Sequence, residues 1–122
     1  MKKELREQVW QKCDCKCAYC GENLEYHKME IDHKVPIYRN HSNEELLSMN
    51  IVRGTNEFKN LLPSCKQCNY YKSTFSISEF KNQLYTIIDR IKKPFIVRLA
   101  IKYGLISFKT FDGKFYFETQ NK

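Results

Sequence analysis

Two short segments, Cys17-Ala18-Tyr19-Cys20 and Cys65-Lys66-Gln67-Cys68, decide how this chain folds. Each is a Cys-x-x-Cys motif, whose two sulfurs lie close together on a tight turn and bind the same metal ion. Four cysteines in two such pairs are typical of a closed tetrahedral zinc site. We therefore predict a structural zinc ion that joins two segments separated by the 44 residues between Cys20 and Cys65.

The length of the chain explains why a metal is needed. With 122 residues it is one small domain, near the size at which a hydrophobic core alone gives marginal stability. Zinc binding adds roughly 10–16 kcal/mol of apparent free energy to small metal-dependent folds. Two more cysteines, Cys13 and Cys15, precede the first pair, but their spacing does not make the usual tight turn. We interpret them as spare or solvent-exposed thiols; the alternative is that one is a stand-in ligand.

The rest of the composition indicates a cytoplasmic protein with a polyanionic partner. The N-terminal segment is charged and has no apolar region of the kind found in a secretory leader. The most apolar stretch, residues 95–106, is interrupted by Arg98 and Lys102, so we expect no membrane span. The formal net charge is +7, which favours nucleic acid as the partner.

Most of this charge lies at the C-terminal end. Residues 81–122 contain nine Lys/Arg and three Asp/Glu, a formal excess of +6. Two interpretations stay open: the segment binds the DNA backbone, or it is a packed helix and hairpin with a solvated basic face. The first would assign phosphate contacts to four side chains: Lys92, Lys93, Arg98 and Lys102.

Local patterns predict the elements on both sides of the second cysteine pair. We expect a helix over residues 3–12, a strand over 28–35, and a polar loop over 37–59 with a helical turn at 44–49. A short helix should follow Cys68.

Beyond residue 75 the patterns are those of an extension. Ser76-x-x-Glu79 is a capping box that opens a helix reaching Ile91, and a second helix should run over residues 95–103 and end at Gly104. Asp112-Gly113 predicts a two-residue β-hairpin turn, with Phe108 facing Phe117 and Thr110 facing Phe115. We expect residues 1–80 to form the core and residues 81–122 a basic helix and hairpin extension of the same domain.

Between the cysteine pairs lie two further motifs, Asp32-His33-Lys34-Val35-Pro36 and Asn60-Leu61-Leu62-Pro63. A lone Asp-His pair carries little information, whereas its combination in this order with two Cys-x-x-Cys motifs is specific. Over residues 13–80 the chain resembles the HNH endonucleases, whose active site is a ββα-metal motif. The third letter of that family is often His and is here Asn69, so the chain resembles an HNN variant. The fold this implies is α+β, a ββα-metal core held by a four-cysteine zinc site, with a C-terminal helical segment and β-hairpin.

Hydrolysis of a phosphodiester needs an activated water and a stabilised leaving oxygen. A neutral histidine can accept the proton, and Mg²⁺ or Mn²⁺ on hard oxygen ligands can stabilise the charge. The resemblance implies that His33 is the general base, that Asp32 and Asn69 hold the metal, and that Asn60 fixes the loop and the imidazole. It places Lys72 near the phosphate backbone.

Each of these residues has an ordinary alternative role as an exposed turn, cap or surface side chain; their joint spacing is what favours catalysis. The leading hypothesis is therefore an endonuclease that cuts DNA, most simply double-stranded, and leaves a 5′-phosphate. The alternative is a non-catalytic, zinc-stabilised module that binds nucleic acid. The chain could also act as a homodimer or as the cutting subunit of a larger nuclease assembly.

Overall fold

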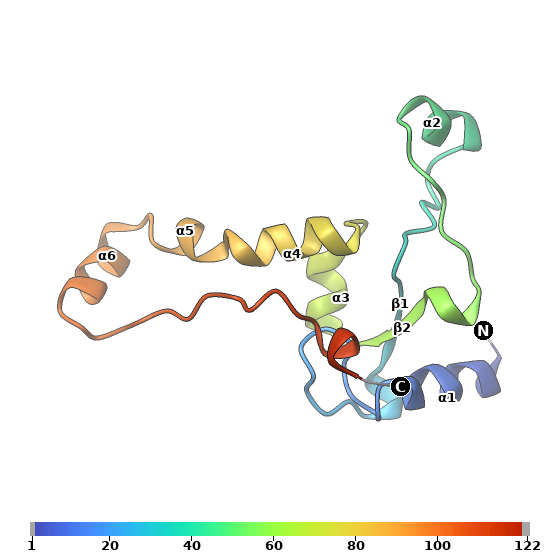
Figure 1. Ribbon diagram of the computed structural model, residues 1–122, viewed down its shortest axis with the longest axis horizontal. Coiled ribbons are helices and arrows are strands. Elements are labelled where there is room, and N and C mark those ends of the chain that lie inside the picture. Colours follow the sequence, from blue (N-terminus) through green and yellow to red (C-terminus); the bar gives the residue numbers. More distant parts are fainter. Residues whose placement is uncertain (1, 121–122) are drawn as a thin grey trace.

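An antiparallel pair of strands and the helix that follows it lie at the centre of the computed structural model, which describes residues 2–120 (Figure 1). β1 (Glu30–His33) pairs with β2 (Leu61–Ser64), and α3 (Lys66–Lys72) begins two residues after β2 ends. A small two-stranded sheet combined with helices confirms the expected α+β class and the ββα order of the core.

The register of the strand pair explains which side chains reach the surface. Ile31 lies opposite Pro63 and His33 opposite Leu61. All four residues of β2 are buried, whereas β1 buries Asp32 alone and leaves its other residues partly accessible. β2 thus serves as the inner strand, and β1 presents its side chains to the neighbouring loop and helix.

The N-terminal helix packs on the inner strand. α1 (Lys3–Lys12) confirms the predicted helix and buries Val9 in the core against β2. Two of its side chains bind the following loop: the Trp10 indole donates to the Leu24 carbonyl at 2.7 Å, and Arg6 donates to the carbonyls of Tyr26 and Met29. The 3₁₀ turn Tyr26–Lys28 lies in this loop and leads into β1.

The long connection between the two strands extends away from the sheet (Figure 1). Its expected helical turn is α2 (Asn43–Ser48), opened by a capping box in which Ser42 and Glu45 bind each other's backbone. A second 3₁₀ turn, Phe58–Asn60, returns the chain to β2. These elements give the connection its own local order.

Past α3 the next helix still packs on the core through Phe80. α4 (Ile77–Tyr85) begins at the predicted capping box, where the Ser76 hydroxyl accepts the Glu79 amide at 3.1 Å. The expected single helix is divided at Thr86, whose hydroxyl donates to the Asn82 carbonyl at 3.0 Å. Such a bond to the residue four positions earlier bends a helix.

The division produces α5 (Ile87–Ile91), which is followed after Pro94 by α6 (Phe95–Lys102). Figure 1 shows these helices projecting from the rest of the molecule, with the chain returning beside them. We refer to residues 86–110 as the arm and to residues 3–80 as the core. Neither α5 nor α6 has a buried residue.

The predicted β-hairpin at the C-terminal end is wrong. Within residues 2–120, the segment 105–115 has no strand, and Asp112-Gly113 forms an isolated turn in which the Asp112 carboxylate accepts the Lys114 amide at 2.9 Å. Gly113 has a φ of 85°, as the turn chemistry predicts. The pair therefore bends the chain through the Asp112 side chain, and the two-residue hairpin turn that it predicted does not form.

The competing interaction is packing on the first cysteine loop. Phe115 is 2% exposed and packs on Tyr19, and the amides of Tyr116 and Phe117 bind the carbonyls of Tyr19 and Ala18 at 3.1 and 2.8 Å. The aromatic residues thus satisfy their backbone groups on the core instead of on each other. The 3₁₀ turn Tyr116–Thr119 is the last element of the described chain.

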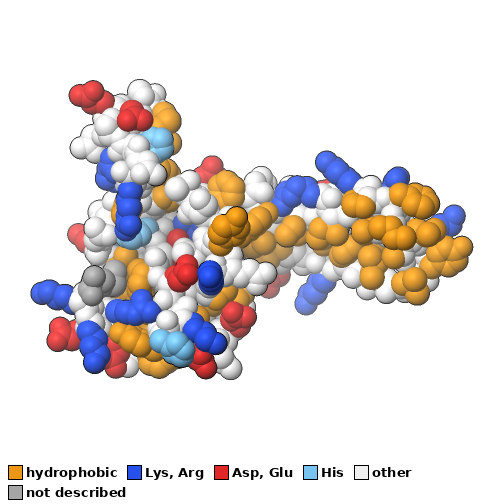
Figure 2. All heavy atoms as spheres, turned by 180° about the vertical axis from the view of Figure 1, so that it is seen from behind, with side chains coloured by type: hydrophobic (Ala, Val, Ile, Leu, Met, Phe, Trp, Pro, Cys, Tyr) orange, Lys and Arg blue, Asp and Glu red, His pale blue; other side chains and the backbone are white. Residues whose placement is uncertain are grey.

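The arm differs from the core in what it leaves exposed. Phe95 and Ile96 are each 69% exposed, and Tyr103 and Leu105 are more exposed still. Figure 2 shows hydrophobic side chains spread along one face of the arm, with Lys and Arg side chains at its edges. Among the helices of residues 2–120, none is long and apolar enough to cross a bilayer.

Candidate active site

The four cysteines of the two motifs come together in one cluster. The sulfurs of Cys17, Cys20, Cys65 and Cys68 all lie within 4.8 Å of one another, and those of Cys20 and Cys65 are 4.0 Å apart. A tetrahedral zinc ion with Zn–S bonds of about 2.3 Å would separate its ligands by roughly 3.8 Å. The cluster therefore has the size and the ligand set of a closed zinc site.

Two different turns shape the cluster. At the first pair, the amide of Gly21 binds the Cys17 carbonyl at 3.0 Å, and Gly21 adopts a φ of 79° that favours glycine. At the second pair, Cys65 caps the N-terminus of α3, and its sulfur accepts the Cys68 amide at 3.4 Å. The metal ligands are thus part of the local structure on both sides.

The protonation of the thiols also fits a cation. A hydrogen bond from Cys68 lowers the pKa of Cys17 to about 4, despite the opposing effect of burial. Burial raises the pKa of Cys20 to about 12, and the bond to Cys17 is the largest of the effects that raise the pKa of Cys68. One thiolate forms readily, and four adjacent thiolates require a compensating cation such as Zn²⁺.

The two earlier cysteines do not belong to this cluster. In the part of the chain that is described, the metal-ligand group contains neither Cys13 nor Cys15. Cys13 is 2% exposed and packs in the hydrophobic core, so its interpretation as a solvent-exposed thiol is wrong. Cys15 is half-buried.

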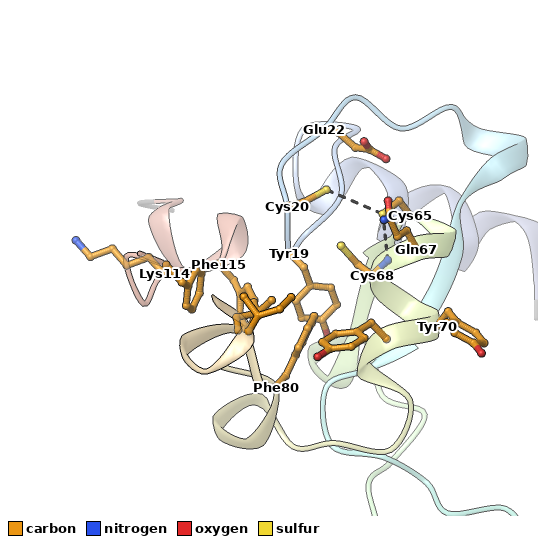
Figure 3. Close-up of a pocket in the computed structure, with 14 residues that line it drawn as sticks. Tyr19, Cys20, Glu22, Cys65, Gln67, Cys68, Tyr70, Phe80, Lys114 and Phe115 are labelled. Carbon is orange, nitrogen blue, oxygen red and sulfur yellow. Dashed lines mark hydrogen bonds between the residues drawn. The ribbon is translucent and has the colours of Figure 1, made fainter. Parts of the chain in front are cut away.

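Tyr19, which lies between the first two cysteines, connects the cluster with the strand motif. Figure 3 shows its ring beside Cys20 and Cys68, at the wall of an apolar cavity of about 720 Å³. Phe80 and Phe115 pack on this ring with centroid distances of 5.2 and 5.0 Å. Its hydroxyl donates to the Asp32 carboxylate.

Asp32 lies at the centre of a buried polar group. It is 5% exposed, accepts the Tyr19 hydroxyl through Oδ2, and has the Lys72 ammonium 3.2 Å from Oδ2 and 3.4 Å from Oδ1. Burial raises the pKa of Asp32, with Lys72 opposing this effect, and burial likewise raises the pKa of Tyr19 so that the phenol stays a donor. Oδ1 therefore has one long contact and keeps lone pairs for another ligand.

Lys72 does not lie where we expected it. Its side chain is 0% exposed, and its ammonium also donates to the His33 carbonyl at 3.0 Å. The prediction that Lys72 contacts the phosphate backbone is contradicted, because the ammonium is enclosed between α3 and β1. A lysine at this spacing from Asn69 shares its helical face, and here that face is turned inward toward the strand.

His33, the predicted base, is half-buried at the end of β1. Its Nε2 lies 2.8 Å from Oδ1 of Asn56, a residue of the long connection between the strands. An amide oxygen can only accept, so this contact assigns the hydrogen to Nε2 and leaves Nδ1 as the acceptor. The partner of the imidazole is thus Asn56, and not Asn60 as the family resemblance implied.

Asn60 holds the loop that follows His33. Its Oδ1 accepts the Val35 amide at 2.8 Å, and its Nδ2 donates to the carbonyls of Val35 and Thr55 at 2.9 and 2.8 Å. Gly54 lies in the same place, where an added Cβ would be 1.8 Å from the Val35 carbonyl oxygen. The side chain of Asn60 is buried, and it joins the two segments that carry His33 and Asn56.

The remaining predicted residues lie in two places. Asn69 is half-buried on α3 and donates through Nδ2 to Oε1 of Glu30 at 2.6 Å. The four basic residues assigned to phosphate contacts are exposed on the arm, and within residues 2–120 they form no ion pair. They are Lys92, Lys93, Arg98 and Lys102.

Sequence reasoning missed three residues of this site. Glu30 could have been found, because it is two residues before Asp32 on the strand and therefore lies on the same face. Tyr19 stood inside a cysteine motif that was interpreted only as a metal turn. Asn56 carried no signal, since it lies in a polar connection whose path depends on tertiary contacts.

The structure thus combines a four-cysteine cluster with an antiparallel strand pair that ends at His33 and a following helix whose Asn69 reaches the strand. Residues 17–75 match the family model of the HNH endonuclease. Over these residues, just under half of its length, the chain is similar to the HNH endonucleases.

The chain is similar to a curated bacterial protein and to part of a solved structure. YoqL, an SPbeta prophage-derived protein of Bacillus subtilis strain 168 named for the HNH endonucleases, is 30% identical over 86 residues, 66% of this chain and 35% of YoqL. The chain thus spans about a third of that relative. The crystal structure of the Type II-C Cas9 enzyme from Actinomyces naeslundii aligns with 81% of this chain and 10% of its own, with a TM-score of 0.49 and 22% identity.

Proposed function

We propose that this chain is a metal-dependent endonuclease that hydrolyses phosphodiester bonds of double-stranded DNA. The observation that carries the proposal is the place of His33. It ends a strand whose other face is fixed by Asp32, Tyr19 and Lys72, and its imidazole has one nitrogen bound to Asn56 and the other available as an acceptor. A histidine held in this way is suited to remove a proton from an attacking water.

His33 is the general base in this proposal. With the hydrogen on Nε2 donated to Asn56, Nδ1 accepts the proton of the water as it attacks phosphorus. Asn60 is a positioning residue, because its three hydrogen bonds hold the loop after His33 against the segment before Asn56. The hydrogen bonds of Asn56 and Asn60 thus hold the His33 imidazole in one orientation.

Asp32 and Asn69 would hold the catalytic Mg²⁺ or Mn²⁺. The lone pairs left on Oδ1 of Asp32 and the amide oxygen of Asn69 are hard oxygen donors of the kind that these ions prefer. Bound there, the ion would stabilise negative charge on the phosphate and on the leaving oxygen. Cys17, Cys20, Cys65 and Cys68 would hold a structural zinc ion, which keeps β2 and α3 in place.

The arm is the proposed DNA-binding extension. Its exposed Lys92, Lys93, Arg98 and Lys102 have no carboxylate partners in the described chain, so they are available to phosphate oxygens. We propose that residues 1–80 form the nuclease core and 81–122 its basic extension. Because each chain has one active site, a double-strand break requires two copies of the chain or two successive cleavage events by one copy. Free thiols that bind a metal are suited to the reducing cytoplasm, where we propose that the protein acts.

Incubation of the purified chain with supercoiled plasmid tests the proposal. Added Mg²⁺ or Mn²⁺ should give nicked and linear products, and excess EDTA should prevent them. Binding to the plasmid without cleavage at every metal concentration would instead support a non-catalytic, zinc-stabilised module. The buried Asp32–Lys72 pair would then have only a structural role.

A further inference from the structure

The contact between α3 and β1 involves a carboxylate that the proposed mechanism has not used. Glu30 and Asp32 are two residues apart on β1 and share a face of the strand, while Asn69 and Lys72 are three apart on α3 and share a face of the helix. The structure pairs them as Glu30 with Asn69, at 2.6 Å, and Asp32 with Lys72. Each candidate metal ligand is therefore bound to a neighbour across the same interface.

The chemistry of the Glu30–Asn69 contact fixes the orientation of the amide. An ionised carboxylate can only accept hydrogen bonds, so it selects the NH₂ group of Asn69 and excludes its oxygen. The oxygen and the nitrogen of an amide project from its carbon in different directions, so the Asn69 oxygen is directed away from the Glu30 carboxylate. Hard cations bind the amide oxygen and not the amide nitrogen.

We propose that Glu30 is a positioning residue that turns the Asn69 amide so that its oxygen faces the catalytic cation. This inference rests on the metal site proposed above and assigns Glu30 no direct contact with the ion. Without Glu30 the Asn69 amide would populate both of its orientations. Its oxygen would face the cation in only one of them. Removal of such an orienting partner typically lowers metal affinity about 10- to 100-fold.

Two substitutions separate orientation from charge. Glu30→Gln removes the charge but keeps an oxygen that can accept the Asn69 NH₂ group, whereas Glu30→Ala removes both. Glu25→Ala is the matched control, because Glu25 is an exposed carboxylate in the loop before β1 that forms ion pairs with His27 and Lys28. Any effect of general charge loss should appear equally in the control.

The experiment measures Mn²⁺ binding to the full-length, zinc-loaded chain by isothermal titration calorimetry. Zinc content and the circular dichroism spectrum check that each variant is folded. We expect Glu30→Ala to weaken Mn²⁺ binding about 10- to 100-fold, and Glu30→Gln and Glu25→Ala to stay within about threefold of the wild type. The double variant Glu30→Ala/Asn69→Ala should bind Mn²⁺ as Asn69→Ala does, because Glu30 acts only through Asn69.

Three results would overturn the inference: unchanged Mn²⁺ affinity in Glu30→Ala, an equal loss in Glu30→Gln, or a further loss in the double variant beyond that of Asn69→Ala. The last would make Glu30 a ligand and not a positioning residue. If Glu30→Ala fails to fold, Glu30→Gln and Glu25→Ala still test the inference. A loss of Mn²⁺ affinity in Glu30→Gln but not in Glu25→Ala would contradict orientation by hydrogen bonding. A different result separates the two proposals. If the Mn²⁺ affinities of the wild type and the variants are as expected but the wild type does not cleave plasmid, the nuclease proposal is refuted and the role of Glu30 stands.

Discussion

The arm has a larger fraction of hydrophobic residues than the core, yet it buries far fewer of them. In the core, Val9 and Leu61 share a buried cluster with Cys17 and Cys65, which join distant segments, and Phe115 packs on this cluster from the C-terminal end. In the arm, α5 and α6 bury no residue, although α6 is strongly apolar. The difference shows that apolar side chains stabilise a segment only where the topology gives them a surface to cover.

Charge follows the same division. The core encloses its Lys72 ammonium against Asp32, whereas the arm exposes six Lys/Arg and one Asp over residues 86–110. A buried charge must be paired where an exposed one need not be. The core therefore contains a charge pair that specifies structure, whereas the Lys and Arg side chains of the arm are all exposed.

Loss of a metal ligand should have the largest effect and should act on the core. Cys68→Ser removes one of four ligands, so we expect loss of zinc and of cooperative unfolding, since structural zinc contributes about 10–16 kcal/mol in small domains. Elemental analysis and thermal unfolding measure both. Cys15→Ser, which lies outside the cluster, is the control and should keep one zinc per chain. A folded Cys68→Ser protein would show that the cluster is not the main constraint.

Removal of the ion pair beneath β1 should come next. Lys72→Met leaves Asp32 buried without its partner, and breaking a buried pair costs about 3–5 kcal/mol. Denaturant unfolding should detect this loss, while Lys66→Met, at an exposed position of the same helix, should change stability by less than about 0.5 kcal/mol. Equal stability of the two variants would mean that the Asp32–Lys72 pair does not form in solution.

Substitution of the base should affect chemistry without affecting the core. His33→Ala removes the proposed proton acceptor, so plasmid cleavage should fall about 10²- to 10⁴-fold while zinc content and unfolding stay near wild type. Asn56→Ala should give a smaller loss, because it removes only the partner of Nε2. Wild-type turnover in His33→Ala would remove this residue from the mechanism.

Charge removal in the arm should have the smallest effect and should leave the core intact. The combined change of Lys92, Lys93, Arg98 and Lys102 to Gln should weaken DNA binding for all sequences alike and flatten its dependence on salt. Each lost phosphate contact should reduce the slope of log K against log[salt] by about 0.9. Cleavage at saturating DNA should persist, as the site lies in the core. A wild-type slope in this variant would place DNA binding elsewhere.

Sequence reasoning succeeded where a feature depends on residues close in the chain or on a strict chemical requirement. The cysteine cluster, the helix over residues 3–12 and the Ser76 capping box all have this character. It failed where distant segments compete for the same side chains. Phe115 packs on Tyr19 instead of pairing in a hairpin, and Lys72 turns toward Asp32 instead of solvent.

Hydrogen–deuterium exchange on the zinc-loaded chain, before and after removal of zinc, tests most directly whether the cysteine cluster stabilises the core while the arm stands outside it. Amides of β1, β2 and α3 should exchange slowest and should lose their protection when zinc is removed. Amides of α6, an eight-residue helix without buried residues, should exchange fast in both states. Protection of α6 equal to that of β2, or core protection that survives without zinc, would contradict this division of the molecule.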